Sequence, residues 1–263
     1  MPKKKLKIKN YLKKLKPLLI GLGYTSLFVL LFAFIGSSFW WAKKIDHLHL
    51  ENITVRGNDY LNRDQIIETS IIPKYPNLLN LNINTIQESI ENHPFIKSAI
   101  VSREFPSAMN IDVVERLPLA YINNASQMYL VDSEGIVLPV RKGQFDFDVP
   151  ILSGFNSDKN LYPIGNRSLS QKVLEAISFL TEIKNNHSDL YNDLSEVQIS
   201  AVDEYILCLS KYPTKIYLGV NAISNQLSIL HEFSVMLNNK RSLHDFHYVD
   251  LRYKNQVIVK ERV

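Results

Sequence analysis

The side chains best suited to chemistry lie scattered along the chain. His244, Asp245 and His247 could be metal ligands, but they straddle a predicted helix-to-strand junction, and no second His/Cys pair completes four ligands. Cys208 is the single cysteine, and its apolar neighbours predict a small buried side chain rather than a nucleophile with an activating base. The sequence contains no glycine-rich phosphate loop. We therefore expect a protein that is not an enzyme, with no catalytic residues, no bound metal and no cofactor.

The segment 18–42 is an apolar run of 25 residues without a charged side chain. As a helix it would reach roughly 37 Å, whereas the hydrocarbon core of a bilayer is about 30 Å thick. A cleaved secretory signal is the alternative, but its apolar region has only about 7 to 15 residues. Trp40 and Trp41 at the far end are typical of an interfacial anchor. The length therefore predicts a single transmembrane helix that is retained.

The N-terminal tail, residues 1–17, predicts how that helix is oriented. It contains no acidic residue and eight lysines, at positions 3, 4, 5, 7, 9, 13, 14 and 16. The positive-inside bias holds such a tail in the cytoplasm, so we expect the rest of the chain to be exported. Beyond the tail, 22 basic residues stand against 26 acidic ones, a net charge near −4. This balance argues against nucleic acid as a partner, whereas the tail suits an anionic lipid surface.

The segment 43–118 alternates between strand and helix signals. A strand over 50–55 ends at the turn signal Gly57-Asn58, and Asn62 is a suitable N-cap for a short helix. For a second helix we expect Asn84 or Thr85 as the cap, with Glu88 completing a capping box. Two strands, 96–103 and 109–115, follow. Strand, helix, helix, strand, strand predicts an α+β layer with helices packed on a small sheet.

The segment 119–263 is richer in strands. Its alternating patterns predict strands at 119–123, 127–131, 136–140, 196–201, 205–209, 215–218, 247–253 and 256–261, with helices at 169–183 and 223–237. The last strand could lie at a sheet edge that accepts a strand from another chain. Lys254 and Lys260 at its borders would deter indiscriminate pairing. We therefore expect a β-rich domain with two helices and an open sheet edge.

Five stretches of sequence carry a family resemblance. They are ITVRGN at 53–58, HPFIKSAIVSREFP at 93–106, IDVVERLPLA at 111–120, YLVDSEG at 129–135 and YVDLRY at 248–253. With the basic tail and the single span, they make the chain resemble the bacterial FtsQ/DivIB cell division family. Two departures are visible, because Phe105 replaces the usual tryptophan and the last strand lacks the glycine often found near its start.

The resemblance implies a domain order and a location. It implies a cytoplasmic basic tail at 1–17, a transmembrane helix at 18–42, a POTRA domain at 43–118 and a β domain at 119–263. The expected protein is a single-pass type II protein of the bacterial inner (plasma) membrane, with periplasmic C-terminal domains and enrichment at the division septum. Its implied role is that of a non-catalytic bitopic divisome scaffold that helps recruit and regulate septal peptidoglycan synthesis.

The resemblance also implies partners and a binding site. The partners are FtsB-like and FtsL-like bitopic division proteins and other divisome members, with no small-molecule substrate. Arg252 would make an ionic contact and Tyr253 an aromatic anchor, and the backbone that receives a partner strand would come from Asn255, Gln256, Val257, Ile258 and Val259. The alternative reading is that Arg252 and Tyr253 only pack and solvate the sheet.

Two other protein classes remain open from the sequence. A POTRA-containing outer-membrane assembly or secretion factor should continue into a long β-barrel, and we expect a chain ending at Val263 to be too short for one. A periplasmic enzyme on an anchor would require a pocket with convergent titratable groups. Glu115 and Arg116 are expected on a solvated strand end, where an ion pair contributes about 0 to 1 kcal/mol.

Overall fold

The computed structural model describes residues 3–42, 48–125, 127–140, 146–219, 223–237, 241–254 and 256–262, and within the N-terminal helix it describes the side chains of 21–41. Two compact units interleave in the sequence. One comprises Met1–Arg56, Ile71–Ile86 and Ile100–Ile111, and the other comprises Gly57–Ser70, Gln87–Ala99 and Asp112–Val263. The domain boundaries expected from the sequence stay predictions.

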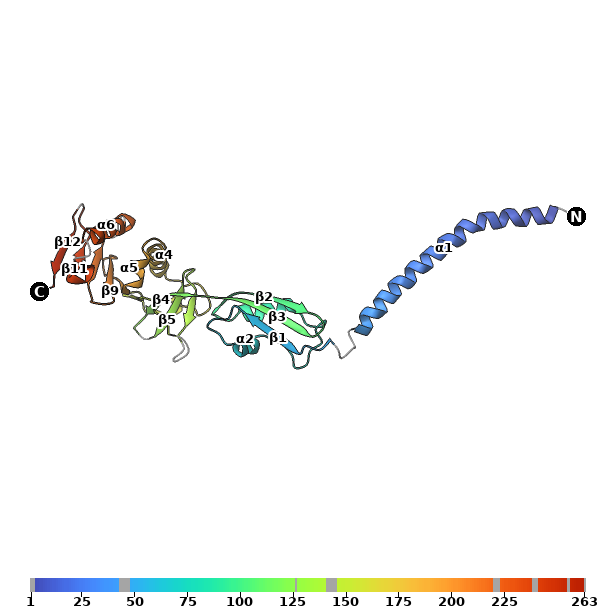
Figure 1. Cartoon of the computed structure of the whole chain (residues 1–263), viewed down its shortest axis with the longest axis horizontal. Coiled ribbons are helices and arrows are strands. Elements are labelled where there is room, and N and C mark those ends of the chain that lie inside the picture. Colours follow the sequence, from blue (N-terminus) through green and yellow to red (C-terminus); the bar gives the residue numbers. More distant parts are fainter. Residues whose placement is uncertain are drawn as a thin grey trace. The chain divides into compact units, whose positions relative to one another are not determined.

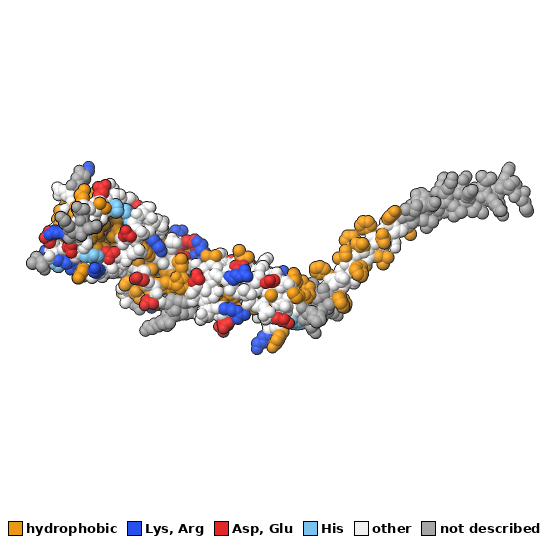
Figure 2. All heavy atoms as spheres, in the orientation of Figure 1, with side chains coloured by type: hydrophobic (Ala, Val, Ile, Leu, Met, Phe, Trp, Pro, Cys, Tyr) orange, Lys and Arg blue, Asp and Glu red, His pale blue; other side chains and the backbone are white. Residues whose placement is uncertain are grey.

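The N-terminal helix α1 runs from Lys3 to Ala42, so its helical backbone begins well before the apolar run. Its segment Gly21–Trp41 is long and apolar enough to cross a membrane. The helix is drawn in Figure 1, its described side chains are exposed, and Figure 2 shows hydrophobic side chains along it. The hydroxyls of Thr25 and Ser37 donate to the carbonyls of Leu22 and Phe34, each at 3.0 Å, which satisfies these polar groups within the helix. The helix therefore fits a membrane anchor.

The first folded elements confirm the predicted α+β order. They are β1 (Asn52–Arg56), α2 (Arg63–Thr69), α3 (Ile83–Glu91), β2 (Ile96–Glu104) and β3 (Ala108–Glu115). The three strands form a sheet in the order β1-β3-β2, here called the small sheet. In β3 the side chains of Met109, Ile111 and Val113 are buried and alternate with more exposed ones, as a half-buried strand requires.

The predicted cap of α3 is wrong. The helix begins at Ile83, and the Asn82 side chain accepts a 3.4 Å hydrogen bond from the N–H of Thr85. Asn82 and Asn84 are equally good caps by type, so residue type could not choose between them. Ile86 and Ile90, which are four residues apart in this helix, are both buried and lie on one helix face.

The expectation of a solvated end for β3 is also wrong. The Glu115 carboxylate accepts backbone N–H bonds from Asp59, Tyr60 and Leu61 at 3.0, 2.8 and 2.8 Å. This carboxylate therefore holds the turn that follows β1.

The neighbouring Arg116 lies in a network of charges. Its Nη1 lies 2.7 Å from Asp132 Oδ2 and 2.8 Å from Glu134 Oε2, and Lys97 Nζ lies 2.7 Å from Glu134 Oε1. The Arg116 and Asp132 side chains are only 16% and 6% exposed. Hydrogen bonds from Lys97 and Arg116 lower the pKa of Glu134. A pair this buried is costly to break, unlike an exposed ion pair.

Nine strands of the described chain form a second sheet, here called the large sheet. They are β4 (Pro118–Asn123), β5 (Met128–Asp132), β6 (Val137–Pro139), β7 (Ile151–Ser153), β8 (Leu194–Ile199), β9 (Tyr205–Leu209), β10 (Lys215–Leu218), β11 (Phe246–Asp250) and β12 (Ile258–Glu261). Their order is β12-β11-β10-β9-β8-β7-β4-β5-β6. Three pairs, β4–β7, β7–β8 and β10–β11, are parallel. Parallel neighbours need a crossover, and helices occupy the connections from β7 to β8 and from β10 to β11.

Three helices accompany the large sheet and lie along one side of it in Figure 1. They are α4 (Gln171–Asn186), α5 (Ser188–Asn192) and α6 (Ile223–Met236). The buried face of α4 includes Val173, Ile177 and Leu180, as predicted, and α6 contributes Leu227 and Leu230 to the same core. Leu169 was expected on the α4 stripe but is 67% exposed, because Ser170 caps the helix and Leu169 precedes it.

Candidate partner-binding edge

The two ends of the large sheet are built differently. At one end β6 is followed outward by the loop 164–167, which pairs with the chain at Ile136 and Val137. The N–H of Val137 donates to the Asn166 carbonyl at 2.9 Å, and the Val137 carbonyl accepts from the N–H of Gly165 at 2.8 Å. This end is therefore sealed by the chain itself.

At the other end, among the described residues, β12 pairs only with β11. The register places Asp250 opposite Ile258, Val249 opposite Val259, and Tyr248 opposite Lys260. Because hydrogen-bonding direction alternates along a strand, about half of the backbone groups of β12 point away from β11. This side of β12 is the candidate site, and we call it the open edge.

Side chains alternate around the open edge. Val257 and Val259 are partly buried and pack against the core, whereas Ile258 is 38% exposed and Lys260 is exposed. One face of β12 is thus held by apolar packing while the other face stays accessible. The predicted strand 256–261 is shorter in the structure, because β12 begins at Ile258.

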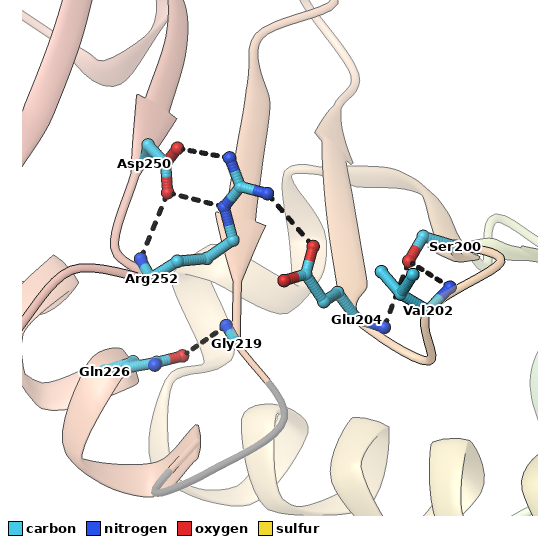
Figure 3. A network of polar contacts seen from close by, with 7 residues as sticks. All are labelled: Ser200, Val202, Glu204, Gly219, Gln226, Asp250 and Arg252. Atoms are coloured by element: carbon cyan, nitrogen blue, oxygen red, sulfur yellow. Dashed lines mark hydrogen bonds and ion pairs between the residues drawn. The ribbon is translucent and has the colours of Figure 1, made fainter.

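The turn between β11 and β12 is organised by Arg252 (Figure 3). Its Nε and Nη2 lie 2.9 and 2.6 Å from the two carboxylate oxygens of Asp250, and its Nη1 lies 3.0 Å from Glu204 Oε2. The guanidinium also lies over the Tyr217 ring, 5.1 Å from its centroid. Glu204 is held in turn by its backbone N–H, which donates to the Ser200 hydroxyl at 3.1 Å. The network therefore joins four segments of the large sheet.

The charges in this network reinforce one another. Hydrogen bonds to Asp250 and Glu204 raise the pKa of Arg252, and the hydrogen bond from Arg252 lowers the pKa of Asp250. A bidentate arginine–carboxylate pair fixes direction as well as charge. Arg252 is still 35% exposed, so its guanidinium is ordered yet reachable from solvent.

The remaining predicted site residues lie in the same turn. The prediction placed Arg252 and Tyr253 at the end of a strand over 247–253, but β11 ends at Asp250 and both residues follow it. Tyr253 is 54% exposed, and its carbonyl accepts a 3.4 Å hydrogen bond from the N–H of Gln256. Asn255 lies outside the described residues. Of the predicted receiving residues, Ile258 and Val259 lie in β12, and Gln256 and Val257 precede it.

Arg262, which the sequence reading missed, fixes the far end of β12. Its Nε lies 3.0 and 3.1 Å from the carbonyl oxygens of His244 and Phe246, and its Nη2 lies 3.3 Å from Thr214 Oγ1. Thr214 is fully buried, and its hydroxyl donates to the Phe246 carbonyl at 2.7 Å. Arg262 therefore follows β12 directly, whereas Arg252 lies just after β11, six residues before β12 begins. The only local signal for Arg262 was its position three residues after an apolar stretch. Its hydrogen-bond partners lie 16 to 48 residues earlier in the sequence, so the signal did not identify them.

The described residues hold no cluster of three or more His, Cys, Asp or Glu side chains that could bind a metal ion. His244 instead pairs with Asp193, whose Oδ2 lies 2.9 Å from Nε2, and His247 is exposed. Cys208 lies in β9, 8% exposed, and burial raises the pKa of its thiol, which disfavours the reactive thiolate.

Comparison with known proteins gives consistent matches. A family model described as POTRA domain, FtsQ-type matches residues 48–116, and one described as FtsQ/DivIB, C-terminal related matches residues 117–260. The chain is similar to the cell division protein DivIB of Clostridium acetobutylicum, with 24% identity over 216 residues, which are 82% of this chain and 84% of that protein. It is 27% identical over 217 residues to the cell division protein FtsQ of Syntrophotalea carbinolica, covering 82% and 74% of the two chains. For the FtsQ of Geotalea daltonii the identity is 27% over 214 residues, with coverage of 81% and 75%.

Proposed function

The chain belongs to the FtsQ/DivIB family of cell division proteins, and from this premise we propose that it is a non-catalytic, membrane-anchored scaffold of the division machinery. In this role it binds FtsB-like and FtsL-like bitopic proteins, with other divisome members, and helps recruit and regulate septal peptidoglycan synthesis. No small-molecule substrate, metal or cofactor is required of the chain in this role.

The proposed topology follows from the charge on either side of the apolar helix. The lysine-rich tail stays in the cytoplasm, α1 crosses the inner membrane once, and the residues after it lie in the periplasm. A bitopic partner then runs beside this chain in the same orientation and reaches the open edge from outside the membrane. Enrichment at the septum follows from binding to proteins that are already there.

The open edge is the observation that carries the proposed binding mode. A partner segment in extended conformation adds to β12, since backbone hydrogen bonds supply affinity and side chains on alternate positions supply specificity. Its residues would meet Ile258 and Lys260 on the accessible face, which favours a strand that mixes apolar and acidic residues. The half-exposed ring of Tyr253 offers an anchor next to the strand, and tyrosine and arginine are common at binding hot spots. Arg252 is ordered by Asp250 and Glu204, so an acidic partner residue would bind the N–H groups that these two carboxylates leave unused or would displace Glu204.

The test is co-purification of the full-length chain with an FtsB-like coiled-coil protein from detergent-solubilised membranes. Ile258→Pro and Val259→Pro form an internally matched pair, because the N–H groups of adjacent strand residues point to opposite sides. One of these prolines removes a hydrogen bond to β11 and should lower the thermal unfolding midpoint. The other removes only an N–H donor that faces the open edge. We expect the variant that keeps its unfolding midpoint to lose the partner.

Side-chain variants test the turn. Tyr253→Ala should weaken binding about tenfold or more, the size of a hot-spot truncation, and Arg252→Gln should weaken it as well. Leu169→Ala removes a side chain of similar exposure outside the site and serves as the control. Binding that is unchanged in all four site variants would refute the assignment of the open edge.

A further inference from the structure

Two loops expose apolar and aromatic side chains on the unit that contains α1. The loop 71–77, between α2 and α3, exposes Ile71 (70%), Lys74 and Tyr75 (84%), and the turn between β2 and β3 exposes Phe105 (56%). We call these four residues the loop surface. The stretch 71–77 reads IIPKYPN and contains no acidic residue.

Both loops are hydrogen-bonded to the chain that follows α1. The N–H of Leu50 donates to the Pro76 carbonyl at 3.0 Å, and the N–H of Leu78 donates to the Leu48 carbonyl at 2.8 Å. The N–H of Glu51 donates to the Ser107 carbonyl at 2.8 Å. The positions of the two loops are therefore set by residues 48–51, the first described residues after the helix.

The length of the connection limits how far the loops can lie from the membrane. Ala42 ends α1, and Leu48 is six residues further on, which spans at most about 22 Å when fully extended. The headgroup layer adds roughly 5 to 8 Å to each side of the hydrocarbon core. The loop surface thus lies within reach of the leaflet from which α1 emerges.

The chemistry of the loop surface suits that layer. Tyrosine is enriched at membrane–water interfaces because its ring is apolar and its hydroxyl is polar, and lysine can extend its stem over apolar groups while its charge meets phosphate. Tyr75 has a φ of +55°, a left-handed conformation that is uncommon for a residue with a side chain. The loop holds this conformation with the ring directed into solvent rather than into the core.

We propose that Ile71, Lys74, Tyr75 and Phe105 form a second membrane contact, which inserts into the headgroup region of the same bilayer that α1 crosses. This proposal rests on the proposed membrane anchoring. The contact restrains the folded residues that follow α1 at the bilayer surface. A peripheral contact of this kind depends on the tether, because a few side chains bind lipid weakly by themselves.

The test uses the full-length chain in lipid nanodiscs that contain phosphatidylglycerol and a headgroup-nitroxide lipid as the quencher. In a Cys208→Ala background, single cysteines are introduced as Tyr75→Cys, Phe105→Cys, Trp41→Cys and Val202→Cys and labelled with a small fluorophore. Trp41 reports on the anchor, and Val202, which is 69% exposed, is the control outside the loop surface. We expect loss of fluorescence at 41, 75 and 105 and unchanged fluorescence at 202.

The outcomes separate the two proposals. Quenching at 41 without quenching at 75 and 105 overturns the loop surface and leaves the anchor intact, whereas absence of quenching at 41 overturns the anchor. A third outcome is that the probe at 75 is not quenched by the lipid and is shielded from aqueous iodide only when a division protein is added. This outcome would assign the loop surface to a protein partner and overturn the lipid contact. A second set of variants carries the probe at position 105 and no label at 75. In this set Tyr75→Ser and Lys74→Glu should each reduce the quenching of the probe at 105.

Discussion

The large sheet ends in two edges that the same chain treats in opposite ways. At β6 the loop 164–167 folds over the strand, and its backbone bonds to Val137 occupy the outward groups. At β12 the outward groups meet no other element of the described chain. An unprotected edge invites pairing with other chains, and proteins commonly cover such edges or blunt them with charge. The difference suggests that specific side chains around β12 keep the open edge uncovered and in place.

These side chains are two arginines, Arg252 and Arg262, and two lysines, Lys254 and Lys260. Arg252 fixes the chain where β11 ends, and Arg262, directly after β12, bonds the carbonyls of His244 and Phe246. Lys254 and Lys260 place positive charge beside β12. We propose that this arrangement prepares the edge for one kind of partner and disfavours pairing between copies of the chain.

The largest effect is expected from breaking the sealed edge. Val137→Pro removes the N–H that donates to the Asn166 carbonyl, and it replaces a side chain that is fully buried. We expect the free energy of unfolding to fall by about 3 kcal/mol, measured from urea unfolding of the full chain in detergent. The matched control is whichever of Ile258→Pro and Val259→Pro removes an N–H that faces the open edge. Its free energy of unfolding should fall by less than about 1 kcal/mol. Equal losses at the two edges would contradict the distinction between them.

A smaller effect is expected at the end of β12. Arg262→Ala removes hydrogen bonds from a charged donor to the carbonyls of His244 and Phe246. Hydrogen bonds to charged groups contribute about 1.5 to 3 kcal/mol, so the opening free energy of β12 should fall by about 2 kcal/mol. Hydrogen exchange of the peptide that contains β12 measures it. Lys260→Ala is the control, and similar exchange in the two variants would show that Arg262 does not hold the strand.

The sequence predicted those elements whose signals are local. The apolar run ends at Ala42 as expected, α6 begins at the expected Ile223, and the alternating patterns located β11 and β12. The family resemblance is confirmed by matches over residues 48–260. The element order and fold class followed because each strand or helix of ordinary length carries its own periodicity.

The parts that failed depend on contacts between distant residues or on very short elements. β7 has three residues and α5 has five, too few to show a period, and neither was expected. Glu115 looked like a polar strand end, yet its carboxylate meets backbone groups 54 to 56 residues away. The role of Arg262 depends on Thr214, 48 residues earlier, so no local pattern contained it.

The smallest effect on stability, and the sharpest test of the comparison, is expected from Lys260→Val. Lys260 is exposed and lies opposite Tyr248 at the edge of the sheet, so the free energy of unfolding should change by no more than about 0.5 kcal/mol. Removing its charge lengthens the apolar stretch of the open edge and should let two copies pair edge to edge. We expect a concentration-dependent dimer in sedimentation of the variant in detergent, absent from the parent chain and suppressed by an FtsB-like partner. If Lys260→Val stays monomeric, the charge at this border does not protect the edge, and the proposed preference of β12 for a partner must come instead from the way Arg262 fixes the end of the strand.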